Sequence, residues 1–324
     1  NGVTVEAGDR FKSLIDKIAT MEGRMISYCD VLDAKLNVSR GLAGAGVYNG
    51  KIYVMAGMSN SNTHLSDVEY LDYTSNDSTW IQMSGVTMSV PRSNFGVVTI
   101  GSKFYCMGGV NSSTSRFGEH AIFDASNNTW SRITGAPPIL TTSAVGYNNT
   151  EIIMFGYTSD NTWSLVDYTI STNKFTTITV AGHSYNHFYG DLKYVNNLYY
   201  NISGRNNTAT YFKAIGGIEY YDLSTGKFTP CDGHMIFPVV DSANCVYNGY
   251  IYCFGGRMGN TAPVDFVQRF NLSTSTWEVL NVKLNTPRYG AAHVLIDNKF
   301  YCIGGFGSSD NTLDTIEVCD LSKI

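Results

Sequence analysis

Short apolar runs recur along the chain and are separated by polar segments rich in Gly, Asn, Ser and Thr. Three of these runs are nearly identical, namely "FYCMGG" at 104–109, "IYCFGG" at 251–256 and "FYCIGG" at 300–305. Weaker copies read "IYVMAG", "IIMFG" and "LYYNISG". The copies recur about every fifty residues, a period that favours propeller blades over helical solenoids.

Each copy lies in a larger repeating unit that predicts four β-strands. An apolar run precedes the glycine strand, and a polar stretch, a strand ending in Asp or Asn, a short turn and an aromatic residue follow it. We call the four strands a, b, c and d in chain order. The recurring positions are Tyr53, Tyr105, Ile152, Tyr200, Tyr252 and Tyr301 in strand b, then Asp72, Asp124, Asp167, Asp222, Asn271 and Asp320 in strand c, and Trp80, Trp130, Phe175, Phe228 and Trp277 in strand d.

This combination of a double glycine after strand b, an Asp closing strand c and a Trp opening strand d resembles the kelch repeat over about residues 28–324. The resemblance implies an all-β fold, a six-bladed β-propeller of four antiparallel strands per blade, with strand a innermost. Blades three and four depart from the pattern, because "MFG" and "ISG" replace the double glycine. Their b strands are therefore expected to end differently.

The two ends of the chain predict how the ring closes. Residues 29–40, "CDVLDAKLNVSR", align without gaps to 277–288, "WEVLNVKLNTPR", which is strand d of blade five and its exit. The C-terminus stops after strand c of blade six. We therefore expect the N-terminal strand to complete the last blade, because an open propeller would expose two unpaired ladder edges. The predicted propeller covers residues 26–324.

Residues 1–25 are expected to form a short helical lead-in or a linker from a longer chain. Asp9 is placed to cap a helix and Gly23 to end it. The apolar residues of its predicted face are Phe11, Leu14, Ile15, Ile18 and Met21. Two readings remain open: the helix packs on the rim of the propeller, or its spacing marks a coiled-coil stalk.

Composition narrows the classes of partner. Charged residues make up 15 % of the 324 residues, and the formal net charge is -5 without a basic run. This balance argues against nucleic acid and against insertion into, or binding to, an anionic membrane surface. No apolar stretch approaches the roughly 20 residues of a membrane span. We expect a soluble mature chain or a piece excised from a longer one.

Strand order predicts which loops share a face. Antiparallel strands place the d-to-a and b-to-c connections on one face and the short a-to-b and c-to-d turns on the other. The b-to-c stretches are long, as in "MSNSNTHLSD", and such loops commonly carry recognition. The candidate ligand-binding residues on the d–a/b–c face are Arg40, Arg92, Asn60, Asn62, Asn111, Arg116, Tyr157, His183, Tyr185, Arg205, Tyr211, Asp241, Arg257 and Arg288. The corner arginines either clamp a ligand carboxylate or pair with a neighbouring blade.

The seven cysteines are expected to be free thiols, because Cys106, Cys253 and Cys302 share one strand position in different blades and cannot meet. Cys231 with Cys245 is the pair worth testing. Eight N-x-S/T sequons occur, but a chain this rich in Asn, Ser and Thr produces such matches by chance, so glycosylation is not favoured.

Local motifs of catalysis are missing from the sequence. It has no P-loop, no nucleophile elbow and no Cys-x-x-Cys, and His183 and His187 lead into a strand, which separates them by about 13 Å. We therefore predict no cofactor, no metal site and no enzymatic activity. The resemblance leaves an enzyme as an alternative, since some kelch propellers are copper oxidases or sialic-acid mutarotases.

The sequence thus favours a non-catalytic module that binds a glycan or a protein through the d–a/b–c face. It is expected to belong to a larger surface or virion assembly such as a phage tail or fibre, with other subunits as further partners. The alternative is an intracellular kelch adaptor that presents substrates to a cullin ubiquitin ligase. Localisation stays open, with reduced thiols favoured and a virion or cell surface considered.

Overall fold

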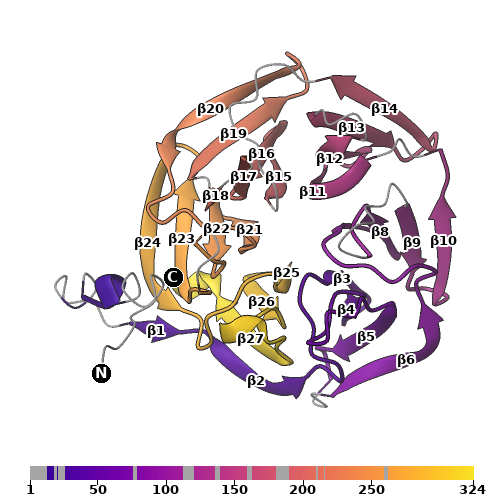
Figure 1. The fold of residues 1–324 in the computed structure, drawn as a ribbon, viewed down its shortest axis with the longest axis horizontal. Coiled ribbons are helices and arrows are strands. Elements are labelled where there is room, and N and C mark those ends of the chain that lie inside the picture. The colour runs from indigo at the N-terminus through magenta and orange to yellow at the C-terminus, as the bar shows by residue number, and fades with distance from the viewer. Residues whose placement is uncertain are drawn as a thin grey trace.

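The computed structural model describes residues 13–17, 20, 26–75, 79–111, 120–135, 139–158, 163–179, 190–208, 211–214, 216–258 and 262–324. These residues form six four-stranded sheets arranged as blades around a central axis (Figure 1). Within each blade the four strands pair antiparallel in the order a, b, c, d. The predicted six-bladed β-propeller is therefore confirmed.

The blades follow one another round the ring. Blade 1 contains β3 (Gly44–Tyr48), β4 (Lys51–Met55), β5 (Asp67–Asp72) and β6 (Trp80–Thr87), and blade 2 contains β7 (Gly96–Ile100), β8 (Lys103–Met107), β9 (His120–Asp124) and β10 (Thr129–Ile133). Blade 3 contains β11 (Ile139–Tyr147), β12 (Glu151–Thr158), β13 (Trp163–Thr169) and β14 (Lys174–Thr179). Blade 4 contains β15 (Asp191–Val195), β16 (Leu198–Ile202), β19 (Gly217–Asp222) and β20 (Lys227–His234), and a separate hairpin, β17 (Arg205–Thr208) with β18 (Tyr211–Ala214), fills its b-to-c connection.

The last two blades complete the ring. Blade 5 contains β21 (Ala243–Tyr247), β22 (Tyr250–Phe254), β23 (Phe266–Asn271) and β24 (Thr276–Lys283). Blade 6 contains β25 (Ala292–Ile296), β26 (Lys299–Ile303), β27 (Thr315–Asp320) and, as its outer strand, β2 (Asp30–Lys35). Two short 3₁₀ turns, η1 (Ser308–Asp310) and η2 (Leu321–Lys323), lie in and after this blade.

The core lies between neighbouring blades, where the aromatic positions of strand b meet the next sheet. Tyr53 of blade 1 is 4 % exposed, and its ring centroid lies 5.3 Å from that of Phe104 and 5.9 Å from that of Phe123 in blade 2. Between blades 5 and 6 the rings of Phe254 and Phe300 stack at 4.2 Å. The repeated letters therefore reflect one packing problem that every pair of blades solves in the same way.

The second glycine of the pair provides a turn that a residue with a Cβ does not fit, whereas Ala56 and Ser203 adopt a positive φ at the first position. Gly256 has φ of +98°, and a Cβ at this position would lie 2.8 Å from the carbonyl oxygen of Val240. Gly305 repeats both features, with φ of +97° and the Tyr289 carbonyl 2.8 Å away. In blade 3, where the double glycine is replaced, β12 continues past Gly156 to Thr158, as expected. The expectation is wrong for blade 4, where β16 ends at Ile202 and Ser203 and Gly204 keep the positive φ of the usual pair.

The N-terminal strand closes the ring as predicted. β2 pairs antiparallel with β27, in a register that places Asp30 opposite Val318, and thus forms the outer edge of the last blade (Figure 1). Ala34 and Leu36 are 3 % and 4 % exposed and belong to the apolar cluster between blades 6 and 1. A further strand, β1 (Ser27–Tyr28), pairs parallel with β24 and extends blade 5 by a fifth strand.

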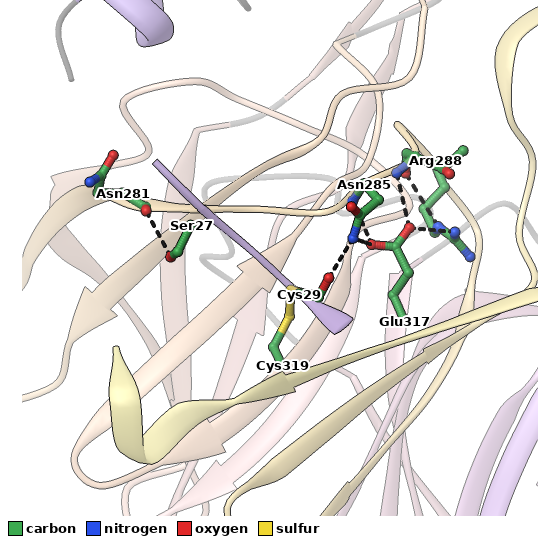
Figure 2. The surroundings of a disulfide bond; sticks show 8 residues. Ser27, Cys29, Asn281, Asn285, Arg288, Glu317 and Cys319 are labelled. Atoms are coloured by element: carbon green, nitrogen blue, oxygen red, sulfur yellow. Dashed lines mark hydrogen bonds and ion pairs between the residues drawn. A yellow bond between two sulfur atoms is a disulfide. The ribbon is translucent and has the colours of Figure 1, made fainter. Parts of the chain in front are cut away.

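The expectation of seven free thiols is wrong for two of them. Cys29 and Cys319 form a disulfide that joins the segment between β1 and β2 to β27 (Figure 2). The pair escaped the sequence argument because it weighed only cysteines within the blade repeats, whereas ring closure brings together residues 290 positions apart. Cys231 and Cys245 are both free, as are Cys106, Cys253 and Cys302.

The described part of the N-terminal lead-in packs against the propeller. Residues 13–17 and residue 20 are helical, and Ile15 is 5 % exposed within an apolar cluster that includes Met235 and Phe237. The Asp16 carboxylate pairs with the ammonium of Lys283, which is 2 % exposed. These contacts support the rim-packing interpretation over a free stalk. Phe11, Ile18 and Met21 lie outside the described residues.

Candidate functional site

Paired backbone segments place the d-to-a and b-to-c loops on the same face, as strand order predicted. Isolated β-bridges connect Gly41 with Met58, Ser93 with Val110, Val240 with Arg257, and Tyr289 with Phe306. Each bridge joins the segment before a strand a to the segment after a strand b. The d–a/b–c face is thus a continuous surface in blades 1, 2, 5 and 6.

Two corner arginines are buried, and their guanidinium groups are occupied inside the protein. Arg40 is 1 % exposed, and its Nη2 donates to Asp67 Oδ2 at 2.7 Å and to Glu69 Oε1 at 2.5 Å. Arg288 is also 1 % exposed and donates from Nη2 to Glu317 Oε1 at 2.6 Å and from Nη1 to the Gly304 carbonyl at 2.9 Å.

The corner arginines are therefore structural, which corrects their assignment as ligand clamps. Arg92 is fully buried, with Nη1 donating to the Gly108 carbonyl at 2.9 Å. The guanidinium of each corner arginine bonds the ends of strands b or c of the blade that follows it. Its backbone instead bonds the neighbouring blade that precedes it, as where the Gly305 N–H donates to the Arg40 carbonyl at 2.8 Å. The carboxylates are held equally firmly, since Glu317 also accepts from Asn285 and from the Thr286 backbone N–H (Figure 2).

The remaining predicted site residues are distributed unevenly. Asn60 is exposed, and its Oδ1 accepts from the backbone N–H of Thr312, which links the b-to-c loops of blades 1 and 6. Asn62 is exposed at a turn with φ of +55°, and Asn111 is half-buried. Tyr157, Arg205 and Tyr211 lie on β12, β17 and β18, of which the structure describes the backbone at these positions. Arg116, His183 and Tyr185 lie outside the described residues.

A collar of backbone hydrogen bonds links the d-to-a corners of blades 5, 6, 1 and 2 among the described residues. Equivalent corner residues in blades 5, 6, 1 and 2 all have positive φ, namely Asp241, Gly290, Leu42 and Asn94. The Gly290 N–H donates to Asp241 O at 2.8 Å, Leu42 N–H to Gly290 O at 2.7 Å, and Asn94 N–H to Leu42 O at 2.9 Å. A left-handed leucine is unusual, and such strained positions concentrate at ligand sites.

This collar opens into a cavity of about 170 Å³ on the propeller axis. Blades 1 and 6 contribute small side chains to its wall, with Ala45 in β3 and Ala43 and Ala291 directly before β3 and β25. Blade 4 contributes charged side chains instead, Asp191 and Lys193. The wall is therefore asymmetric, with a small-residue side and a polar side.

The polar side is organised around Asp191. Lys193 Nζ lies 2.7 Å from Asp191 Oδ2, Asn244 Nδ2 donates to the same oxygen at 3.2 Å, and the Leu192 N–H donates to Oδ1 at 2.8 Å. Burial alone raises the pKa of Asp191, but Lys193, His293 and these side-chain hydrogen bonds outweigh burial and leave the pKa below its usual value. Asp191 is therefore ionised at neutral pH.

His293 faces this carboxylate from blade 6, with Nε2 3.7 Å from Asp191 Oδ2. Burial, together with the charge of Lys193, lowers the pKa of His293 to about 4, so the ring is neutral at pH 7. The sequence argument missed all three residues. The available signal was that Asp191 and Lys193 occupy the positions in strand a where blade 1 has Gly44 and Gly46.

Arg257, one of the predicted site residues, lies beside the collar. Its Nη2 is 3.3 Å from Asp241 Oδ2, and its Cζ lies 4.3 Å from the centroid of the Tyr289 ring. Tyr289 is in turn fixed by donating its hydroxyl to Asp310 Oδ1 at 2.5 Å. Two predicted residues, Asp241 and Arg257, are thus brought together, and Asp241 also lines the cavity described above.

Two negative findings concern the described residues. Within that part of the chain, no group of three or more His, Cys, Asp or Glu side chains is placed to hold a metal ion. No helix in the same part is long and apolar enough to cross a membrane.

Comparison with known proteins identifies the repeat. The Kelch motif matches residues 39–84, 91–137, 238–281 and 287–323, which together exceed half of the chain. Kelch-like protein 23 of Homo sapiens is 33 % identical over 89 residues, which cover 27 % of this chain and 16 % of that protein. The F-box/kelch-repeat protein SKIP11 of Arabidopsis thaliana is 32 % identical over 77 residues, 22 % of this chain and 16 % of that protein.

A solved structure titled "Structure of YjhT" superposes with a TM-score of 0.72 and covers 88 % of this chain and 96 % of its own, at 12 % identity. Such a likeness shows the shared fold. YjhT is an enzyme, which corrects our prediction that the protein lacks enzymatic activity, because a propeller of this shape accommodates an active site. The fold therefore gives no reason to exclude catalysis.

Proposed function

Because the chain belongs to the kelch-repeat family, we propose that it is a recognition propeller that binds its partner across the d–a/b–c face, over the central cavity. One observation carries this proposal: the collar, the cavity and the Asp191, Lys193 and His293 cluster all open on the face where the long b-to-c loops lie. Loops on a rigid scaffold around a concave site with a few convergent polar groups are the usual setting for ligand binding.

A protein segment is the favoured partner class, since kelch domains generally mediate protein–protein interactions. A glycan is the second class, because the neutral His293 and the amide of Asn94 would suit hydroxyl groups. Membership of a surface or virion assembly and a role as a cullin adaptor remain predictions. The matched relatives are much longer proteins, of which the alignments cover 16 %.

Peptide and glycan arrays probed with the intact protein test the proposal. Any ligand that the arrays select is then measured against two charge reversals, Lys193→Glu in the cavity and Lys103→Glu at the exposed a-to-b turn of blade 2. We expect Lys193→Glu to abolish binding and Lys103→Glu to leave it unchanged. A ligand that binds both variants equally well would place recognition elsewhere on the propeller.

A further inference from the structure

The oxygens of Asp191 are already engaged by protein donors. Oδ1 accepts from the Leu192 N–H, and Oδ2 accepts from Asn244 and lies 2.7 Å from the ammonium of Lys193. A ligand that approaches through the mouth therefore meets a carboxylate whose strongest acceptor directions are occupied. Asp191 holds Lys193 in position rather than offering itself to a ligand.

Lys193 has donors to spare. Its ammonium carries three N–H groups, and among the described residues Asp191 is the one acceptor that it contacts. The side chain is 21 % exposed and lines the cavity. Two N–H groups are therefore available to an acceptor on a bound molecule. His293, neutral at pH 7, adds no positive charge but can donate or accept one hydrogen bond beside them.

Asp241 and Arg257 form a second pair of an acidic and a basic side chain. Asp241 is 4 % exposed at its side chain, whereas Arg257, its partner, is 22 % exposed. The Arg257 guanidinium lies against the Tyr289 ring, with its Cζ 4.3 Å from the ring centroid. In both pairs the acid is used within the protein, and the base keeps N–H donors that the pair does not use.

The size of the cavity limits what enters it. A volume of about 170 Å³ is smaller than the roughly 300–1,000 Å³ of sites that enclose a drug-sized molecule. It suits one side chain or one small ring of a larger ligand. The small residues opposite Lys193, such as Ala45 and Ala291, leave the space for that group and would contact its apolar part.

From this juxtaposition we infer that the cavity takes a carboxylate group of the ligand, which accepts hydrogen bonds from Lys193 and is approached from the rim by Arg257. This inference rests on the proposed function and specifies its ligand chemistry. An acidic side chain of a protein segment and the carboxylate of a uronic acid both provide the group. Binding is expected to weaken with added salt, because the interaction is between charges.

Small probes separate the carboxylate from its neutral counterpart. We would measure binding to the full chain by saturation-transfer NMR and calorimetry. The two comparisons are N-acetyl-glutamate methylamide with N-acetyl-glutamine methylamide, and glucuronate with glucose. A charge-assisted hydrogen bond gives roughly 1.5–3 kcal/mol, so wild type should prefer the carboxylate member by about ten- to hundredfold. The pair that shows the preference identifies the source, peptide or sugar acid.

Three variants test the assigned donor. Lys193→Met keeps the apolar stem and should remove the preference for the carboxylate, Lys193→Arg should restore much of it, and Lys103→Met, at the opposite face, should retain it. Melting temperatures of all three verify folding. Equal binding of acid and amide by wild type, an unchanged preference in Lys193→Met, or no probe binding would each overturn the inference.

The outcomes also separate this inference from the proposed function. If an array-selected ligand binds wild type and loses affinity in Lys193→Glu while no carboxylate preference is found, the face is correct and the ligand chemistry is wrong. If the selected ligand ignores Lys193→Glu, the proposed face itself is wrong.

Discussion

Breaking the Cys29–Cys319 disulfide should markedly destabilise the propeller. The bond closes a loop of 290 residues, and the chain-entropy relation gives about 6 kcal/mol of stabilisation for a loop of this length. The strand that it secures is otherwise held by burial of Ala34 and Leu36 and by a ladder to β27 that registers at Asp30, Val31 and Lys35, with an irregularity between the last two. The disulfide is therefore a major part of ring closure.

The magnitude translates into a measurable shift in melting temperature. With an unfolding entropy of roughly 2.1 cal/mol/K per residue, a chain of 324 residues loses about 9 °C for 6 kcal/mol. We would compare the oxidised protein, the same protein in reductant and the Cys29→Ala/Cys319→Ala variant by calorimetry. The double variant should melt near the reduced wild type and should not respond to reductant. Cys231→Ala, at a half-buried free thiol, is the matched control.

Two results would refute this reasoning. Alkylation of the natively oxidised protein under denaturing conditions should modify five cysteines, so seven modified thiols would show that the disulfide does not form. Equal melting temperatures with and without reductant would show that the noncovalent contacts of β2 close the ring unaided.

Three further predictions concern the fold. Arg288→Met should lower the free energy of unfolding in urea by about 3–5 kcal/mol, because it leaves Glu317 buried without its cation. Lys103→Met, at an exposed site, is the control, and a smaller loss in Arg288→Met than in this control would contradict the structural role. Burial and the charge of Arg92 lower the pKa of His120 to about 4, below its value of about 6.5 in the unfolded chain. The stability that depends on the neutral ring, about 3 kcal/mol, is therefore complete above pH 6.5 and is lost as pH falls toward 4. Between pH 7 and pH 4.5 the unfolding free energy should accordingly fall more in wild type than in His120→Gln, and equal falls would contradict this. Gly256→Ala should cost about 2 kcal/mol more than Gly101→Ala, because φ is positive at both but the new Cβ meets the Val240 carbonyl at one and open space at the other; equal losses of stability would contradict this.

The architecture was readable from the sequence because every blade meets the same packing requirements. The strand b aromatic and the positive-φ glycine recur wherever two sheets stack, so they appear as columns at a fixed period. Ring closure was readable for the same reason, since residues 29–40 repeat the pattern of a strand d that the last blade lacks.

The corner arginines show where that reasoning stopped. The sequence placed these arginines correctly at the corners between blades. Their burial depends on carboxylates in strand c, and the arginine positions alone do not reveal these partners. A signal was present: Arg40 and Arg288 each pair with a glutamate 29 residues later, Glu69 and Glu317. A spacing that recurs in two blades indicates a structural partner rather than a ligand.

The central cluster and the disulfide were missed for a different reason. Asp191, Lys193 and His293 belong to blades 4 and 6, and only the closed ring directs them to one axis. Cys29 and Cys319 likewise meet only after β2 has joined β27. Features built from several blades leave no local pattern, whereas features repeated within each blade do.

Hydrogen exchange of the protein with and without an array-selected ligand tests the central claim most directly. Recognition over the cavity predicts slower exchange at the corner and inner-strand segments 41–45, 93–97, 241–245 and 289–293, and unchanged exchange at the a-to-b turns 49–50, 101–102, 248–249 and 297–298. Protection confined to those turns, or to the outer strands β6 and β10, would contradict it.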